Sequence, residues 1–231
     1  DQAKTTDYGS SGIAGYRFSK DNGSTWTAYQ ASGTYTYSNL TQNQSYTIKV
    51  EAKDKAGNTT QASASESTGE VPSNITVSYS TTDWTNGNVV VTAKANVSGY
   101  TLQYKNGSTW TTYPTAGITL TRNQDIYVRI IDSAGQTSGD SVTGTVGNID
   151  KLSPNTFTPT ATSTTNSVTV TASTTDQAKT ADNGSSGIAG YRFSKDNGST
   201  WTAYQTSGTY TYSGLTQNQS YTIKVEAKDN A

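Results

Sequence analysis

The chain has 231 residues, with 16 basic and 17 acidic side chains and a formal net charge of −1. Such a balance gives no positive field to attract nucleic acid or an anionic membrane surface, so neither is expected as a partner. The chain contains no Cys, His or Met, and this excludes disulfides, imidazole or thiolate zinc sites, and Ser-His or Cys-His nucleophile pairs. No apolar run approaches the ~20 residues that span a bilayer, so this segment is not expected to insert into a membrane.

The composition favours an all-β protein. The chain carries 16 Tyr and 4 Trp and is rich in Thr, a β-branched residue that suits strands and disfavours helices. Disordered chains combine high net charge with few aromatic residues, and this chain shows the opposite combination. We therefore expect a folded protein built of strands.

The chain contains an internal repeat. Residues 1–56, the first copy, and residues 176–231, the last copy, have the same sequence apart from five positions. A weaker repeat lies between them, where residues 104–110 resemble residues 18–26. The unit of duplication is therefore two similar domains in tandem. The five differences are Thr6/Ala181, Tyr8/Asn183, Ala31/Thr206, Asn39/Gly214 and Lys55/Asn230.

Short alternating segments between Gly, Asn and Asp turns predict the strands in chain order. In the first copy, Asn22-Gly23 is expected to turn a hairpin because both residues adopt positive φ at little cost. In the strand at 46–52, Tyr46, Ile48, Val50 and Ala52 are expected to face inward, and Thr47, Lys49 and Glu51 to face water. The predicted strands are 16–18, 25–29, 33–37, 46–52 and 57–68, then 89–93, 100–104, 109–113, 118–120 and 126–131, then 157–161 and 168–172 before the last copy.

About six or seven short strands per ~80 residues predict β-sandwiches. We expect three of them, at 1–69, 70–152 and 153–231, arranged in a line. The first would lack its opening strands and the last its closing strand, so we expect the chain to be an excerpt from a longer array. The joints are short and carry Pro72 and Pro154, which stiffen the chain without adding apolar area. We therefore expect little contact between the domains.

Two segments carry a resemblance to known families. The run Leu40-Thr-Gln-Asn-Gln-Ser-Tyr46 and its copy Leu215 to Tyr221 resemble the penultimate-strand corner of fibronectin type III-like domains. That resemblance implies that Tyr46 and Tyr221 are buried with their hydroxyls bonded to backbone near Leu40 and Leu215. The middle domain has Gln124 at this place, so its corner must be held differently.

The segment Gly147-Asn-Ile-Asp-Lys-Leu-Ser-Pro154 resembles the junction between bacterial immunoglobulin-like repeats of large exported surface proteins. This resemblance implies immunoglobulin-like domains and an extracellular location, at the cell surface or secreted. It identifies an architecture and no ligand.

A third pattern, S-x-D-x-G-x-x-W, occurs in both copies and resembles the Asp-box hairpin of sialidases and other secreted proteins. The Asp can accept hydrogen bonds from turn amides, and Gly supplies the left-handed position. We expect a structural hairpin, with sugar contact by the Trp as the alternative; four scattered arginines do not match the arginine cluster of a sialidase site. The residues are Asp21, Gly23 and Trp26 in the first copy and Asp196, Gly198 and Trp201 in the last.

The remaining acidic candidates are Asp54, Asp132 and Asp229, each at the end of a predicted strand. Turn capping is the simpler interpretation, and Ca²⁺ binding is the alternative. No other cofactor is expected. Lys49 and Lys224 could form Lys-Asn cross-links of the kind found in pilus domains, but both lie on the outward face of their strand.

These patterns favour a structural role without catalysis. A chain without His offers few ways to build a cleft of converging titratable groups. Recent duplication instead lengthens a protein, so we expect a stalk or spacer segment of a bacterial surface protein or filament, an adhesin, with neighbouring copies of the repeat as partners. The alternative is a carbohydrate-binding module of an exported polysaccharide-active protein, with a surface glycan as partner.

Overall fold

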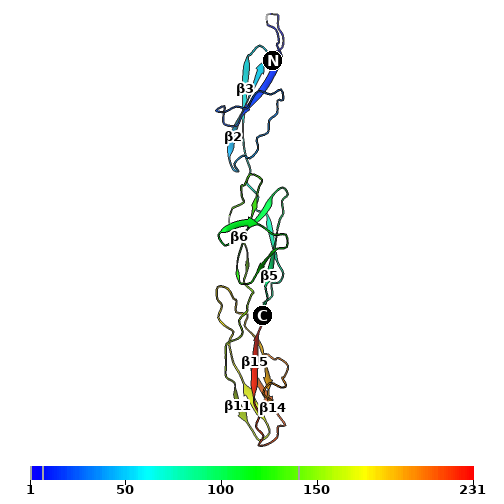
Figure 1. Cartoon of the computed structure of the whole chain (residues 1–231), viewed down its shortest axis with the longest axis vertical. Helices are drawn as coiled ribbons and strands as arrows, with labels where there is room; N and C mark the ends of the chain where they lie inside the picture. Colours follow the sequence, from blue (N-terminus) through cyan, green and yellow to red (C-terminus); the bar gives the residue numbers. More distant parts are fainter. Residues whose placement is uncertain (1, 7, 140) are drawn as a thin grey trace. The chain divides into compact units, whose positions relative to one another are not determined.

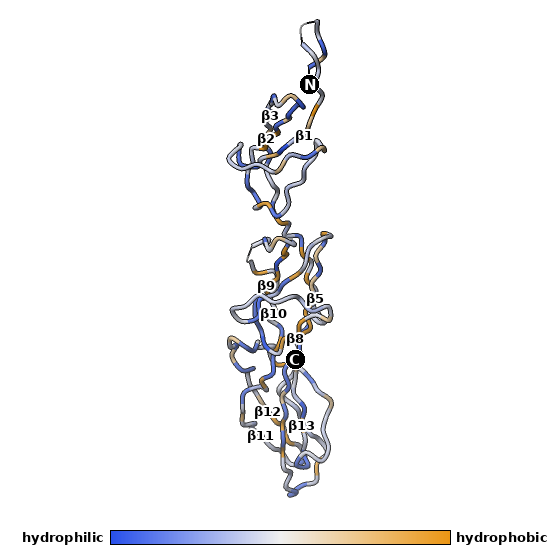
Figure 2. The backbone as a smooth tube through the Cα atoms, turned by 45° about the horizontal axis from the view of Figure 1, so that its top comes forward, coloured by the Kyte–Doolittle hydropathy of each residue, from blue (hydrophilic) through white to orange (hydrophobic). Residues whose placement is uncertain are grey.

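The computed structural model describes residues 2–6, 8–139 and 141–231, and this part of the chain is all-β (Figure 1). Short strands alternate with turns, and Figure 2 shows hydrophobic residues in brief stretches of a largely hydrophilic chain. The strands are β1 (Ile13–Ser19), β2 (Ser45–Asp54), β3 (Thr59–Ser67), β4 (Ile75–Tyr79), β5 (Val89–Ala95), β6 (Thr101–Asn106), β7 (Thr109–Thr112), β8 (Ile118–Leu120), β9 (Gln124–Ile131), β10 (Val142–Val146), β11 (Thr160–Ser163), β12 (Val168–Thr171), β13 (Ile188–Ser194), β14 (Thr209–Tyr212) and β15 (Lys224–Asp229).

The strands form small sheets, and the strand pairs with an assigned register are antiparallel. The first copy and its following strand give the sheet β1-β2-β3. The middle region, residues 75–146, forms the sheets β4-β5-β8 and β10-β9-β6-β7. The last region, residues 160–229, forms the sheets β11-β12-β14 and β13-β15. The all-β prediction is therefore confirmed.

The chain divides into two compact units. Unit 1 comprises residues 1–74, 95–103 and 129–139, and unit 2 comprises residues 75–94, 104–128 and 140–231. The three domain boundaries expected from the sequence remain a prediction.

Unit 1 contains the sheet β1-β2-β3. Phe18 of β1 lies opposite Val50 of β2, and Val50 lies opposite Ala62 of β3. The register of β1 against β2 shifts between Ile13 and Gly15, which marks a β-bulge. Every residue of β3 is exposed. Among the described residues of unit 1, the buried apolar side chains are Phe18, Val71 and Ile130.

Unit 2 contains a sandwich with a well-defined core between two sheets. Val170 of β12 and Ala172, which follows β12, pack with Tyr191 and Phe193 of β13, and Phe193 is fully buried. Side chains of β14 and β15 complete this core from the same two sheets. Burying such apolar area is the main favourable term for the fold. In the part of unit 2 that comes before this sandwich in the sequence, the buried apolar side chains include Val89, Val91, Leu120, Ile126, Val128 and Val146.

Most predicted strands of the middle region appear with small shifts, and 118–120 has the predicted bounds. The structure adds β4 and β10, which the alternation did not indicate. In the first copy, 25–29 and 33–37 are not strands, so that prediction is wrong there. The predicted turn is present, with positive φ at Asn22 and Gly23.

The joint within unit 2 has more contact than expected. The Ile149 carbonyl accepts a hydrogen bond from the Gly184 amide at 2.6 Å. Ile149 and Asp150 are both buried, and a Cβ built on Gly184 would lie 2.2 Å from the Trp84 ring. The expectation of little contact is therefore wrong at this joint. Backbone hydrogen bonds and the Trp84 indole make contacts there that Pro154 does not provide.

A smaller set of contacts links residues of the first and middle regions inside unit 1. The Gln136 side chain accepts from the Gln42 amide and donates to the Leu40 carbonyl at 2.5 Å. The Gln42 side chain in turn donates to the Thr137 carbonyl at 3.1 Å. These bonds are made by amide side chains, whose positions the hydrophobic pattern does not predict.

Across the described residues, the structure holds no helix with the length and apolar character needed to cross a membrane.

Candidate functional site

The Asp-box turn of the first copy is closed by its own side chains. The Ser19 hydroxyl donates to Asp21 Oδ1 at 2.7 Å and accepts from the Gly23 amide at 2.8 Å. Thr25 donates to the same carboxylate through its amide at 2.7 Å and its hydroxyl at 2.5 Å. The bonds from the Thr25 hydroxyl and amide, and then from Ser19, lower the pKa of Asp21 to about 2.

The last copy repeats this turn closely. Ser194 donates to Asp196 at 2.7 Å and accepts from the Gly198 amide at 2.8 Å. Thr200 donates to Asp196 at 2.8 and 2.5 Å, and these bonds again lower the pKa of Asp196 to about 2. Both carboxylates are therefore used to hold their own turn.

Glycine is required at the turn by backbone geometry. Gly23 has φ +93°, and a Cβ there would lie 3.5 Å from Trp26 and 3.4 Å from Lys49. A side chain would be strained by its backbone conformation before it met these neighbours. The Trp26 ring thus lies close to the turn.

Trp26 also belongs to a stack of rings and cations on one face of the β1-β2 pair. The Arg17 guanidinium lies 4.7 Å from the Trp26 ring centroid and 5.0 Å from that of Tyr29. Lys53 Nζ lies 5.5 Å from the Tyr29 ring. Cations at these distances are attracted by the ring quadrupoles. The same stack recurs in the last copy with Trp201, Arg192, Tyr204 and Lys228.

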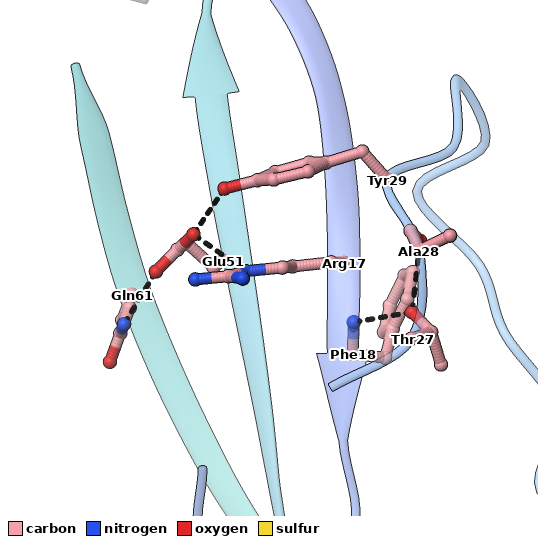
Figure 3. Close-up of polar contacts among 7 residues, drawn as sticks. All are labelled: Arg17, Phe18, Thr27, Ala28, Tyr29, Glu51 and Gln61. Atoms are coloured by element: carbon pink, nitrogen blue, oxygen red, sulfur yellow. Dashed lines mark hydrogen bonds and ion pairs between the residues drawn. The ribbon is translucent and has the colours of Figure 1, made fainter. Parts of the chain in front are cut away.

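Glu51 lies at the centre of this face and is 3% exposed (Figure 3). Its carboxylate accepts from Arg17 Nε at 2.8 Å, from the Tyr29 hydroxyl, and from Gln61 Nε2 at 2.6 Å. The bonds from Arg17, Tyr29 and Gln61 lower the pKa of Glu51 to about 2. The expectation that Glu51 faces water is wrong, because Arg17, Tyr29 and Gln61 cover it.

The Tyr corner is present in both copies. In each copy the Tyr hydroxyl oxygen accepts a hydrogen bond from a backbone amide. Tyr46 Oη accepts from the Thr41 amide at 3.0 Å, and Tyr221 Oη accepts from the Thr216 amide at 3.0 Å. Each amide follows directly after Leu40 or Leu215, the predicted neighbourhood. Both Tyr rings are half-buried, so the corners are more open than predicted. Leu215 is buried and Leu40 is half-buried.

The middle region holds its corner through Asn123, which the sequence reasoning missed. Its side-chain amide donates to the Ile149 carbonyl at 2.8 Å, and its Oδ1 accepts from the Ile149 amide at 2.9 Å. Its backbone amide donates to the Asp182 carbonyl at 2.8 Å. Asn123 is buried, so these bonds satisfy groups that water does not reach. The sequence signal that could have indicated this role is the place of Asn123 directly before Gln124, the residue that stands where the two copies have the corner Tyr.

The acidic candidates are engaged in turns. Asp54 accepts from the amide and the side chain of Asn58, both at 2.8 Å, and the Asn58 side chain contributes most to lowering its pKa. Asp132 accepts from the Ala134 and Gln136 amides at 2.9 and 2.8 Å. Both arrangements are the turn capping that the sequence favours.

Asp229 lies near two other carboxylates of unit 2. Oxygens of Asp150, Asp176 and Asp229 all lie within 4.8 Å of one another. Burial raises the pKa of Asp150, but hydrogen bonds from Ser186 and Leu152 outweigh it and leave the pKa lowered. Asp176 accepts from the Gly187 amide at 2.7 Å, and Asp229 accepts from the Ala231 amide at 3.0 Å. These carboxylates pin backbone amides at the joint.

An open groove in unit 1 is lined mainly by Ser, Thr, Ala and Gly residues. The carboxylate in its described lining is Asp54, which already caps the Asn58 turn. No described lining residue of this groove pairs a second carboxylate with Asp54.

No protein-family model matches the chain. The chain is 32% identical to endoglucanase B of Cellulomonas fimi, a similarity that covers 99% of this chain and 24% of that protein. It is 36% identical to exoglucanase A of Cellulomonas fimi over 44% of this chain and 12% of that protein. Among solved structures, a tetra-tandem repeat in the extending region of a large adhesion protein is similar at 17% identity, covering 97% of this chain and 69% of that one, with a TM-score of 0.29. The chain thus spans a quarter or less of the length of the curated relatives it matches.

Proposed function

We propose that the chain is a non-catalytic structural spacer of a repetitive extracellular protein, built of three sandwich domains arranged in a line. The observation that carries this proposal is that the polar groups of its most conspicuous patterns bond within their own domain. Asp21 and Asp196 hold their own turns, and Glu51 holds the face of the sheet beside Arg17. Groups committed in this way are not free to act on a substrate.

The electrostatics support the absence of catalysis. A general acid needs a carboxyl whose pKa is raised toward neutrality. Among the described carboxyl groups with a resolved shift, the pKa is lowered in every case, and hydrogen bonds are the cause. These groups are Asp21, Glu51, Asp54, Asp150, Asp196 and Glu226.

The bonded joint of unit 2 supports a spacer role. A spacer transmits position along the chain only if its joints resist bending. Here Asn123 makes two bonds to Ile149, and Gly184 makes a third. Such satisfied buried bonds favour one arrangement of the joint over others.

The names of the relatives bear on the kind of host protein that the spacer belongs to. From the sequence we expected an adhesin, a cell-surface or filament protein. The two relatives from Cellulomonas are named as glucan-cleaving enzymes, and the chain covers a minor part of each. We therefore favour a spacer between modules of an extracellular polysaccharide-active protein, with the adhesin stalk as the other setting.

A second candidate function is carbohydrate binding, favoured by the same relatives and by exposed rings. Tyr29 is 41% exposed and Tyr35 is 46% exposed. Against this candidate, Arg17 lies against both Trp26 and Tyr29, so these rings already stack on a cation. A sugar would have to displace that contact or use the opposite ring face.

Three measurements on the full chain test the spacer proposal. Small-angle scattering should give an elongated particle, and a compact profile would reject the linear arrangement. Pull-down on insoluble cellulose and a glycan array should show no retention. If the chain is retained, and Trp26→Ala with Trp201→Ala abolishes retention while Trp110→Ala does not and unfolding is unchanged, the carbohydrate-binding function replaces the spacer.

A further inference from the structure

The chain contains five Asn-Gly pairs, and the structure treats one of them differently from the rest. In such a pair the backbone nitrogen of the glycine can attack Cγ of the asparagine, since glycine has no side chain to obstruct the approach. A C–N bond forms, ammonia leaves, and the cyclic imide is opened by water to aspartate or isoaspartate. The pairs are Asn22-Gly23, Asn86-Gly87, Asn106-Gly107, Asn183-Gly184 and Asn197-Gly198.

In the two Asp-box turns, the attacking nitrogen is held by a hydrogen bond. The Gly23 amide donates to Ser19 Oγ at 2.8 Å, and the Gly198 amide donates to Ser194 Oγ at 2.8 Å. An amide in this state must break its bond and turn before it can reach Cγ of the preceding residue. Its proton is also harder to remove while an acceptor holds it.

Two further pairs are protected in the same way by different acceptors. The Gly87 amide donates to Thr85 Oγ1 at 3.0 Å. The Gly184 amide donates to the Ile149 carbonyl at 2.6 Å in the joint of unit 2, where Gly184 is buried. Four of the five glycine nitrogens are therefore committed.

Asn106 is the last residue of β6, and Gly107 begins the exposed turn to β7. Both residues are exposed, Gly107 has φ +63°, and a Cβ built on it would meet nothing within 4 Å. Within residues 2–6, 8–139 and 141–231, no group accepts a hydrogen bond from the Gly107 amide outside the strand ladders. The Thr109 hydroxyl bonds to the Asn106 carbonyl at 3.0 Å, which orders the turn and leaves the glycine nitrogen free.

The local sequence does not explain this difference. Asn22, Asn106 and Asn197 are each followed by Gly-Ser-Thr-Trp, so their intrinsic reactivity as unfolded peptides should be similar. The fold alone separates them, because Ser19 and Ser194 have no counterpart in the shorter middle hairpin.

We propose that Asn106 is a modification site of this protein, where spontaneous deamidation in the folded state produces aspartate and isoaspartate. The product adds a carboxylate next to Lys105, whose Nζ lies 5.3 Å from the Tyr127 ring and 6.0 Å from the Trp110 ring. Isoaspartate also inserts a methylene into the backbone of the turn. The negative charge of this hairpin should therefore increase with time as Asn106 deamidates.

Incubation of the full folded chain at mildly alkaline pH, followed by digestion and mass spectrometry, tests the proposal. Asn106 should convert about tenfold or more faster than Asn22 and Asn197. At the two slower sites the glycine amide must first break one hydrogen bond, and the free energy of one such bond corresponds to about this ratio of rates. In denaturant the three rates should converge. Equal rates in the folded chain, or the same ranking in denaturant, would overturn the proposal.

Variants of the full chain supply internal controls. Asn106→Gln should remove the fast conversion and leave the other sites unchanged. Ser19→Ala should accelerate conversion at Asn22 while Asn197, in the unaltered copy, keeps its slow rate. If Ser19→Ala disturbs the first hairpin, Thr85→Val provides the same test at Asn86. No acceleration in either variant would mean that hydrogen bonding of the glycine amide does not control the reaction.

Discussion

The first and last copies have nearly the same sequence and different secondary structure. Residues 209–212 form β14 and pair with β12, whereas the identical residues 34–37 of the first copy form no strand. Conversely, β2 extends over Ser45–Asp54 between β1 and β3, and its copy β15 is limited to Lys224–Asp229. Strand formation in this protein is therefore decided by the pairing partner, as expected where β-propensity reflects context.

Burial follows the same rule. Tyr191 is 7% exposed because β11 and β12 cover its side of the sandwich, and the equivalent Tyr16 is half-buried. Glu51 is covered on the other edge by Gln61 of β3, whereas the side chain of Glu226 is 41% exposed. Strands β11 and β12 thus cover Tyr191 in the last copy, and β3 covers Glu51 in the first copy. Variants at matched positions can therefore separate the effect of sequence from that of the neighbouring strands.

The largest expected difference is at the matched phenylalanines. Phe193 is enclosed by both sheets of the last sandwich, so Phe193→Ala should cost about 3–5 kcal/mol. Phe18 is 5% exposed and stacks on Tyr35, as Phe193 stacks on Tyr210, but it lies outside the core that β12 forms around Phe193, so Phe18→Ala should cost about 1.5–3 kcal/mol. Hydrogen exchange of the β13 and β1 amides in the two variants measures each local loss. Equal losses would mean that the core around β12 adds nothing.

The second expected difference is at the matched glutamates. Glu51→Ala removes three bonds and leaves Arg17 without its partner, so we expect a loss of about 1–3 kcal/mol in the first copy. Glu226 bonds to Arg192 and Tyr204 in a more exposed place, so Glu226→Ala should cost about 1 kcal/mol or less. Chemical unfolding followed by copy-specific exchange measures both. A larger loss for Glu226→Ala would contradict the role of β3 in covering Glu51.

Acid should affect the first copy more than the last. The pKa of Glu51 is about 2 in the folded chain against an ordinary value of 4.5, so the unfolded chain binds its proton at higher pH. The stability from this group is therefore present above pH 4.5 and is lost as the pH falls toward 2. Asp21 and Asp196 have the same pKa of about 2 and cancel in the comparison. Amide exchange of both copies across this range measures the difference, which Glu51→Gln should reduce.

The sequence predicted the fold class and most strands of the middle region because alternation and turn residues are local signals. It predicted the Asp-box turn for the same reason: Ser19, Asp21 and Gly23 interact within five residues. It did not predict that Glu51 is buried, since the outward face of a strand looks polar whether water or Arg17 lies against it. It also missed Asn123, whose partner Ile149 is distant in sequence.

The smallest expected effect is at the corner tyrosines, where the copies should agree. Tyr46 and Tyr221 accept the same bond from the amides of Thr41 and Thr216, both at 3.0 Å, and both rings are half-buried. Water can reach an amide released at such a site, so Tyr46→Phe and Tyr221→Phe should each cost about 0.5–1.5 kcal/mol.

Lys49→Ala is the matched control for this corner, because Lys49 lies three residues along the same strand. It should change stability by about 0.5 kcal/mol or less. Urea unfolding with copy-specific exchange resolves these values. A Lys49→Ala loss as large as that of Tyr46→Phe would mean that the hydroxyl bond does not hold the corner. Unequal losses at Tyr46 and Tyr221 would mean that the neighbouring strands, which differ between the copies, reach the corner as well, so that the corner too depends on its pairing partners.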